Sequence, residues 1–192
     1  MSPTPDPRPL FQRAIAQTGR IIDAVEPDQA TYPTPCADFD VQALIAHTAW
    51  ALQRVAAVAT GGDAESVPLV AVEPDTWSER YADSAAAVRA AWADPALLDV
   101  TIHLPFATVP GRVAVAIYTM EVTAHGWDIA KATRQATELD ADIAEAALAT
   151  AAMALPAEPR GGEIPFGPVV AVGADAGPYA RLVAYLGRQP YS

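Results

Sequence analysis

Cysteine, lysine and long apolar runs are all scarce in this sequence. Cys36 is the only cysteine among 192 residues, so neither an internal disulfide nor a zinc site built on several cysteines can form. Lys131 is the only lysine, and 23 acidic against 12 basic side chains give a net charge of −11. This balance excludes the basic surface that nucleic-acid binding requires, and it disfavours anionic membranes.

The sequence predicts neither a membrane span nor a secretion signal. Its longest apolar run, residues 146–157, is about half the length of a helical crossing. Residues 1–9 are rich in proline and lack the basic and apolar regions of a signal peptide, so we expect a disordered arm and a cytoplasmic protein. Residues 10–192 are sufficient for one well-packed domain, and no repeat or linker divides them.

Apolar residues recur with a spacing near 3.6, which predicts a mainly α fold. The fold class we expect is a four-helix bundle with a short β-hairpin and a small C-terminal extension. Asp38 is the predicted N-cap of the second helix. Alternating residues 98–104, followed by 106–109, predict the hairpin. The expected helices cover residues 10–25, 39–60, 76–93, 112–133, 140–154 and 179–186.

The predicted helix 112–133 carries ionisable residues on the face that should be buried. At 100° per residue, Glu121, His125 and Asp128 share a stripe with apolar residues such as Ala114 and Ile129. An ionised, unpaired glutamate in that position would cost several kcal/mol. The sequence therefore implies a compensating partner inside the bundle.

His47 is likewise an ionisable residue on a face that should be buried: on the predicted helix 39–60 it shares a stripe with the apolar residues Leu44 and Val55. Glu121 and His125 are spaced i, i+4, so both can reach one point above their helix. Two imidazoles and a carboxylate are the ligand set of a catalytic divalent-metal site, and the cation would neutralise the glutamate. The alternative is a pair of hydrogen-bonded core histidines without a metal.

Three further polar residues need an interpretation. Two of them have both a functional and a structural interpretation, and the third has no functional one. Asp128 is suitably placed either to hold the second ring nitrogen of His125 or to pair with Arg54. Cys36 precedes a helix start, where the helix dipole favours a thiolate, but a small packed residue is the interpretation we favour. His103 lies in the predicted hairpin and is expected at the surface.

Two motifs resemble a bacterial family. The first motif is the segment 34–41 (Thr-Pro-Cys-Ala-Asp-Phe-Asp-Val), followed by Leu-Ile-Ala-His ending at His47. The second is the Glu-x3-His-x-Trp-Asp pattern that starts at Glu121. Both are similar to motifs of the metal-binding N-terminal domain of mycothiol-dependent maleylpyruvate isomerase, in the DinB/YfiT-like superfamily. Phe39 and Gln42 stand where that family usually has Trp and often Arg. Neither of these residues is a metal ligand.

The resemblance implies a four-helix bundle that binds a divalent cation through His47, Glu121 and His125. The metal in such relatives is usually zinc, with nickel also seen, and the co-substrate is a low-molecular-weight thiol such as mycothiol. Homodimers are common in the superfamily, so a homodimer is compatible with the resemblance. The longer isomerases carry an additional C-terminal domain, and this chain ends at Ser192.

Three functions compete at this point. We favour a metal-dependent thiol S-transferase or isomerase, in which the metal activates a thiolate that attacks an electrophile. A metal-dependent hydrolase is the second, with Asp128 as the only nearby candidate for a general base. The third is a non-catalytic metal- or ligand-binding module, for which a closed sphere of four protein ligands would argue.

Overall fold

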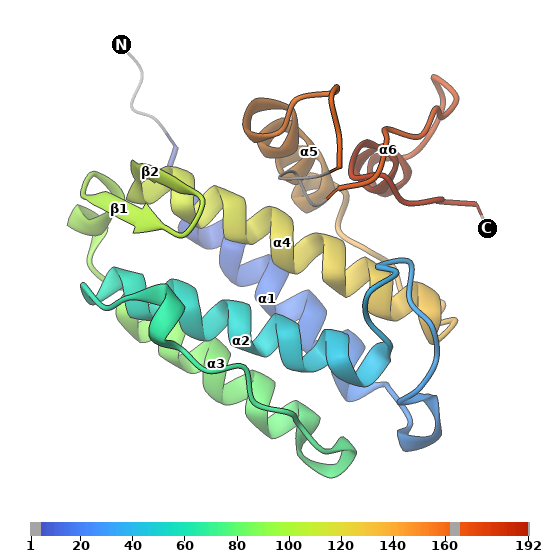
Figure 1. Cartoon of the computed structure of the whole chain (residues 1–192), viewed down its shortest axis with the longest axis horizontal. Coiled ribbons are helices and arrows are strands. Elements are labelled where there is room, and N and C mark those ends of the chain that lie inside the picture. The colour runs from blue at the N-terminus through green and yellow to red at the C-terminus, as the bar shows by residue number, and fades with distance from the viewer. Residues whose placement is uncertain (1–4, 162–165, 192) are drawn as a thin grey trace.

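The computed structural model describes residues 5–161 and 166–191 of the chain, shown in Figure 1. These residues form mainly helices, with one two-stranded antiparallel sheet, so the predicted fold class is confirmed. The α-helices are α1 (Arg8–Asp23), α2 (Val41–Ala59), α3 (Trp77–Ala91), α4 (Gly111–Ala132), α5 (Ala141–Ala154) and α6 (Pro178–Tyr185). Strands β1 (Thr101–Leu104) and β2 (Ala107–Pro110) lie between α3 and α4.

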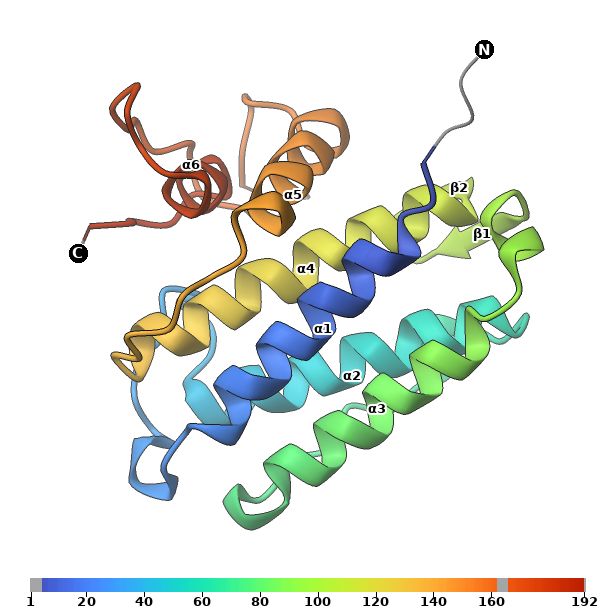
Figure 2. The same cartoon turned by 180° about the vertical axis from the view of Figure 1, so that it is seen from behind.

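Helices α1 to α4 form the bundle, and α5 and α6 lie outside it against α4 (Figures 1 and 2). Within the bundle α4 contacts α1 and α2, while α3 contacts the same two helices and completes the arrangement. The main apolar core lies between these four helices. The predicted C-terminal extension is therefore a helical pair that covers one side of α4.

The first residues of α1 and α2 differ from the sequence-based prediction. Helix α1 begins at Arg8, so Arg8 and Pro9 are helical rather than part of a disordered arm; residues 1–4 of that arm lie outside the described residues. The N-cap of α2 is Asp40, whose carboxylate accepts a hydrogen bond from Ala43 N at 2.8 Å. Asp38, the predicted cap, lies in the preceding turn. Asp38 and Asp40 are the same residue type, two positions apart, and only the backbone path shows which of them caps the helix.

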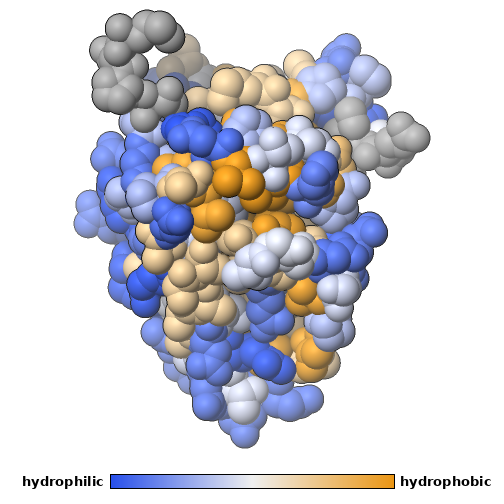
Figure 3. Space-filling view, turned by 90° about the vertical axis from the view of Figure 1, so that its left-hand side faces the viewer, coloured by the Kyte–Doolittle hydropathy of each residue, from blue (hydrophilic) through white to orange (hydrophobic). Residues whose placement is uncertain are grey.

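The hairpin packs at one end of the bundle. Its register pairs Thr101 with Pro110 and Leu104 with Ala107, and His103 is exposed on it, as expected. Figure 3 shows this end of the molecule, where apolar side chains gather among hydrophilic ones; Phe106 is 68% exposed there. Within the described ranges, no helix is both long and apolar enough to cross a membrane.

Helix α4 is buried on almost all sides because it lies between the bundle and the α5–α6 pair. Thr119 and Thr123 are only 3% and 0% exposed, although the helical pattern alone places them opposite the apolar stripe. Each hydroxyl donates to the carbonyl four residues earlier, at 2.8 and 2.6 Å, which satisfies it inside the protein. Two surfaces of α4 are therefore interior: one faces α1 and α2, the other faces α5.

Small side chains let α5 approach α4 closely. Ala144, Ala147 and Ala151 are fully buried in a second core with Ala124 of α4 and Leu182 of α6. This packing brings the segment that follows α6 back to the outer side of α4. The C-terminal segment thereby reaches the part of α4 that carries His125.

Candidate metal centre

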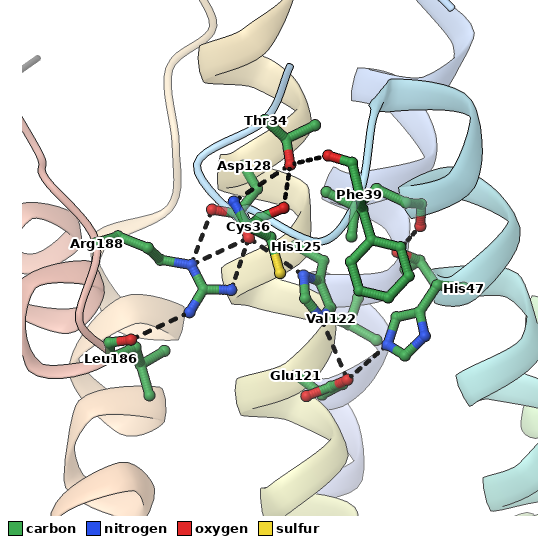
Figure 4. A network of polar contacts seen from close by, with 12 residues as sticks. Thr34, Cys36, Phe39, His47, Glu121, Val122, His125, Asp128, Leu186 and Arg188 are labelled. Atoms are coloured by element: carbon green, nitrogen blue, oxygen red, sulfur yellow. Dashed lines mark hydrogen bonds and ion pairs between the residues drawn. The ribbon is translucent and has the colours of Figure 1, made fainter. Parts of the chain in front are cut away.

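Three of the residues singled out above meet between α2 and α4 (Figure 4). Glu121 Oε1 lies 3.1 Å from His47 Nε2 and 3.2 Å from His125 Nε2. Helix α2 supplies His47, while Glu121 and His125 lie one turn apart on α4. The structure thus brings together the two imidazoles and the carboxylate that helical periodicity places on the interior faces.

This donor set has the dimensions of a metal site. One ligand atom from each residue can be chosen so that all three lie within 4.8 Å of one another. Zinc ligands at about 2.0–2.2 Å in a tetrahedral arrangement lie about 3.3–3.6 Å apart, close to the separations measured here. Among the described residues, no fourth His, Cys, Asp or Glu joins this group, so a cation here would keep a position open.

His125 has an acidic partner at each ring nitrogen. Its Nε2 faces Glu121, and its Nδ1 lies 3.1 Å from Asp128 Oδ2. Burial by itself would lower the pKa of His125, but the charge of Glu121 and the hydrogen bond to Asp128 outweigh it and raise the pKa to about 9. Without a cation, His125 is therefore an imidazolium at neutral pH that donates from both nitrogens.

Glu121 is held ionised by the same contacts. Burial opposes its charge, but the charge of His125 and the hydrogen bonds from His125 and His47 keep the pKa of Glu121 well below its usual range. Its side chain remains 28% exposed, so the carboxylate is within reach of the adjoining cavity. A proton shared with His125 compensates this buried charge here, and a divalent cation would compensate it more strongly.

Asp128 pairs with Arg188 and not with Arg54, so the suggested Asp128–Arg54 pair is wrong. Arg188 Nε and Nη2 donate to the two carboxylate oxygens at distances of 2.7 to 3.1 Å. Asp128 is fully buried and Arg188 is 8% exposed. Burial disfavours the charge of Asp128, but His125 and Arg188 reverse this effect and lower its pKa.

Sequence reasoning assigned no role to Arg188. Its partner lies 60 residues away on another helix, and no local spacing connects the two. The only local signal in the sequence is an arginine two residues after the apolar C-terminal stretch that ends at Leu186. Such a charge needs a buried partner, but the sequence does not identify that partner.

Cys36 lies beside the same cluster, on the loop that precedes α2 (Figure 4). With His125 and Asp128 it forms a second group whose ligand atoms all lie within 4.8 Å of one another. Desolvation by burial raises the pKa of the Cys36 thiol to about 11. The thiol therefore stays protonated at neutral pH, which agrees with a packed side chain rather than an activated thiolate.

A cavity of about 420 Å³ opens next to the three residues. Its walls come from the loop before α2, from α4 and from the C-terminal segment, including Cys36, Phe39, Met120, Phe166 and Arg188. The ring of Phe39 lies 4.9 Å from that of His47, and the ring of Trp50 lies 5.6 Å from it. These aromatic contacts hold the His47 ring in place against the cavity.

Comparison with known proteins agrees with this architecture. Two uncharacterized proteins of Mycobacterium tuberculosis, MT0763 of strain CDC 1551 / Oshkosh and Rv0738 of strain ATCC 25618 / H37Rv, are each 32% identical over 183 residues. Each alignment covers 95% of this chain and 98% of the relative. The similarity therefore extends beyond the bundle into the C-terminal segment that carries Arg188.

Two crystal structures have a similar fold. They are mycothiol-dependent maleylpyruvate isomerase and a histidine-to-alanine mutant of it, with TM-scores of 0.61 and 0.64 and identities of 19% and 18%. The matches cover 76% of this chain and 66% of the isomerase chain. The family described as mycothiol maleylpyruvate isomerase N-terminal domain matches residues 11–130, which contain His47, Glu121, His125 and Asp128, and the chain belongs to that family.

Proposed function

We propose that this protein binds a divalent cation through His47, Glu121 and His125 and uses it in thiol chemistry, as a mycothiol-type S-transferase or isomerase. Zinc is the cation we favour, with nickel as the alternative. The observation that carries the proposal is the separation of Glu121 Oε1 from the two Nε2 atoms, 3.1 and 3.2 Å. These distances match neighbouring ligands of one small cation.

The chain prepares the three ligands in different ways. Asp128 accepts the Nδ1 proton of His125, which directs Nε2 toward Glu121, and Arg188 in turn holds Asp128. A divalent cation in this position lowers the pKa of an incoming thiol and provides a nucleophilic sulfur at neutral pH. The adjoining cavity has the size of a small-molecule site and gives the thiol and its electrophile access to the ligands.

The contacts of Asp128 favour this proposal over a hydrolase. Asp128 is fully buried and bound by both His125 and Arg188, so it has no free access to a water molecule in the cavity. Glu121 is engaged by both imidazoles. A hydrolase would need a general base, and neither carboxylate is free to serve as one.

The experiment is a metal analysis coupled to a thiol assay on the full-length protein. We expect about one zinc or nickel per chain after extensive dialysis. We also expect metal-dependent consumption or isomerisation of an electrophile in the presence of mycothiol, abolished by chelation and restored by the metal. Protein that holds no cation, or that turns over the electrophile equally well without thiol, would overturn the proposal. A homodimer stays a prediction that sedimentation would check.

A further inference from the structure

The C-terminal end of α4 carries two cationic residues that line a cavity without an acidic wall. Lys131 and Arg134 line a cavity of about 680 Å³, together with residues 32–35 of the loop before α2 and residues 187–189. Figures 1 and 2 both show that loop beside the end of α4. The chain has 23 acidic residues and a net charge of −11, yet no Asp or Glu is among the described residues that line this cavity.

Arg134 occupies a backbone position that favours glycine. Its φ angle is 55°, and within the described residues it is the only residue other than glycine with a positive φ. Helix α4 ends there in a Schellman motif, in which Arg134 N donates to Lys131 O at 3.2 Å. Glycine adopts this conformation without a steric cost, whereas a Cβ makes it unfavourable. An arginine at such a position, in spite of that cost, points to a role for its side chain.

The charges of Lys131 and Arg134 are available to a ligand. In the part of the chain that the structure describes, the exposed side chain of Arg134 forms no hydrogen bond or ion pair. The Lys131 ammonium donates to Pro190 O at 3.4 Å, which leaves its charge uncompensated. Arg188 also lines the cavity, but its ion pair with Asp128 at 2.7 Å neutralises it. Two uncompensated positive charges therefore share one cavity.

The dipole of α4 does not account for both cations. Lys131 lies in the last turn of α4, where a positive charge interacts favourably with the dipole. Arg89 does the same in the last turn of α3 without leaving the helical conformation. A cation that only served the dipole would not need the left-handed position that Arg134 occupies.

Tyr32 distinguishes this cavity from a second one of about 670 Å³ that Lys131 and Arg134 also line. In the second cavity, the polar side chains of Gln135 and Thr137 hydrogen-bond to each other at 3.4 Å. In the first, Tyr32 is 40% exposed, and among the described residues its hydroxyl has no hydrogen-bond partner. A phenol both donates and accepts, so the first cavity offers a ligand more than charge.

We propose that the cavity between Tyr32 and the end of α4 binds a small phosphate ester, with the phosphate on Lys131 and Arg134 and the organic part against Tyr32. A phosphate monoester carries about −1.5 to −2 charges at pH 7 and three terminal oxygens. It therefore gains from an ammonium and a guanidinium fork together, whereas a single carboxylate is satisfied by the fork alone. The cavity has the size of a small-molecule site, which leaves room for the organic part.

This site is distinct from the candidate metal centre. Lys131, Arg134 and Tyr32 line this cavity and are not among the residues that line the cavity beside the three candidate ligands. The inference therefore does not depend on the proposed thiol function. Binding at this site is expected whether or not the protein acts on a thiol.

An NMR titration of the full-length protein with inorganic phosphate and with glucose 6-phosphate tests the site. We expect saturable shifts of the backbone amides of residues 32–34 and 131–135, with the ester bound about fivefold more tightly than free phosphate because of one additional hydrogen bond. Lys131→Gln and Arg134→Gln should each weaken the binding of both probes about tenfold. Tyr32→Phe should weaken the binding of the ester alone.

Three outcomes of the titration would contradict the proposal. Shifts confined to the surroundings of His47, Glu121 and His125, or no saturable shifts, would overturn the site. Succinate bound as tightly as glucose 6-phosphate would overturn the assignment to phosphate. Inorganic phosphate bound more tightly than the ester would overturn the assignment of the organic part to Tyr32.

Arg134→Gly separates binding from stability. Glycine relieves the backbone at the end of α4, so this variant should unfold at an equal or higher temperature than the wild type, while its phosphate binding falls as in Arg134→Gln. A lower unfolding temperature with unchanged binding would give Arg134 a purely structural role and overturn the inference.

Arg89→Gln is the matched control for Lys131→Gln. Each variant removes one cation from the last turn of a helix, but Arg89 lines neither cavity. Arg89→Gln should leave the binding of both probes unchanged. An equal loss in Arg89→Gln and Lys131→Gln would mean that binding follows net charge, and this result would also overturn the inference.

Discussion

Arg188 and Asp128 form a buried ion pair that joins the C-terminal segment to α4. The shortest contact, from Arg188 Nη2 to Asp128 Oδ2, is 2.7 Å. Arg188 also donates to its own segment, at Leu186 O, 3.3 Å away. Because the same carboxylate oxygen lies 3.1 Å from His125 Nδ1, the position of the C-terminal segment is linked to the orientation of a candidate metal ligand.

Replacing Arg188 tests this link directly. Arg188→Met leaves the Asp128 carboxylate buried without its cation, and we expect the free energy of unfolding to fall by about 3–5 kcal/mol. Urea unfolding followed by circular dichroism measures the change. Arg181→Met is the control, because Arg181 forms an exposed pair with Glu145 at 3.7 Å, worth about 0–1 kcal/mol. Equal effects of the two variants would contradict the assignment.

The pH dependence of stability should carry the signature of His125. In metal-free protein its pKa rises from the ordinary value of 6.5 to about 9, so the folded state binds this proton more tightly than the unfolded state. The resulting stabilisation is fully present below pH 6.5 and is lost as the pH rises through about 9. We therefore expect the free energy of unfolding of chelated protein to decrease across this interval.

His125→Gln provides the comparison for that titration. The variant cannot take up the proton, so its stability should change much less between the same two pH values. His103→Gln removes an exposed histidine of the hairpin and should leave the wild-type profile intact. A wild-type stability that stays level across the interval, as in His125→Gln, would show that His125 is already neutral in the folded protein.

Gly126 sets the distance between α4 and α1 beside the candidate metal centre. A Cβ at this position would lie 2.4 Å from Thr18 Oγ1, and that hydroxyl donates to Val122 O at 3.1 Å. Alanine usually stabilises a helix relative to glycine by about 1 kcal/mol. Here we expect Gly126→Ala to destabilise the protein by about 1–3 kcal/mol, because α4 must move away from α1.

A double variant separates this clash from other causes. Thr18→Ala removes the atom that the new Cβ meets, so Gly126→Ala should cost much less in the Thr18→Ala background. Thermal or urea unfolding of the four proteins in this cycle gives the coupling. Additive effects of the two substitutions would mean that the contact between α1 and α4 does not determine the choice of glycine.

The interior faces of α2 and α4 were predictable because their determinants are local. His47, Glu121 and His125 depart from an apolar stripe with a spacing near 3.6, and each departure is visible within a single helix. Their convergence follows once α2 and α4 pack together. The family resemblance named the same three residues, so the pattern and the motif agree.

The remaining features depend on packing between distant segments. Thr119 and Thr123 are buried on a helix that α5 covers as a second layer, and a helical pattern cannot show that a second layer exists. The Arg188–Asp128 pair spans 60 residues, and Arg54 was assigned the wrong candidate partner for the same reason. At the start of α2, Asp38 and Asp40 are equally suitable N-caps by residue type. The turn closed by the hydrogen bond from Phe39 N to Cys36 O places Asp40, not Asp38, at the cap.

Metal content in two alanine variants distinguishes the two groups of ligand atoms that share His125. His47, Glu121 and His125 form one group, and Cys36, His125 and Asp128 form the other. Asp128 is occupied by Arg188, and burial keeps the Cys36 thiol protonated with a pKa of about 11. A cation in the second group would have to displace both a proton and a guanidinium.

We therefore expect His47→Ala to lose the metal and Cys36→Ala to keep it. Loss of even an outer partner of a ligand lowers metal affinity by about 10–100-fold, so loss of His47 itself should exceed that range. Cys36→Ala should retain wild-type metal content and thiol-dependent activity, and iodoacetamide should modify wild-type Cys36 slowly at neutral pH. The reverse result, with metal lost in Cys36→Ala and retained in His47→Ala, would place the cation on the Cys36 side of His125, where it would break the Arg188–Asp128 pair.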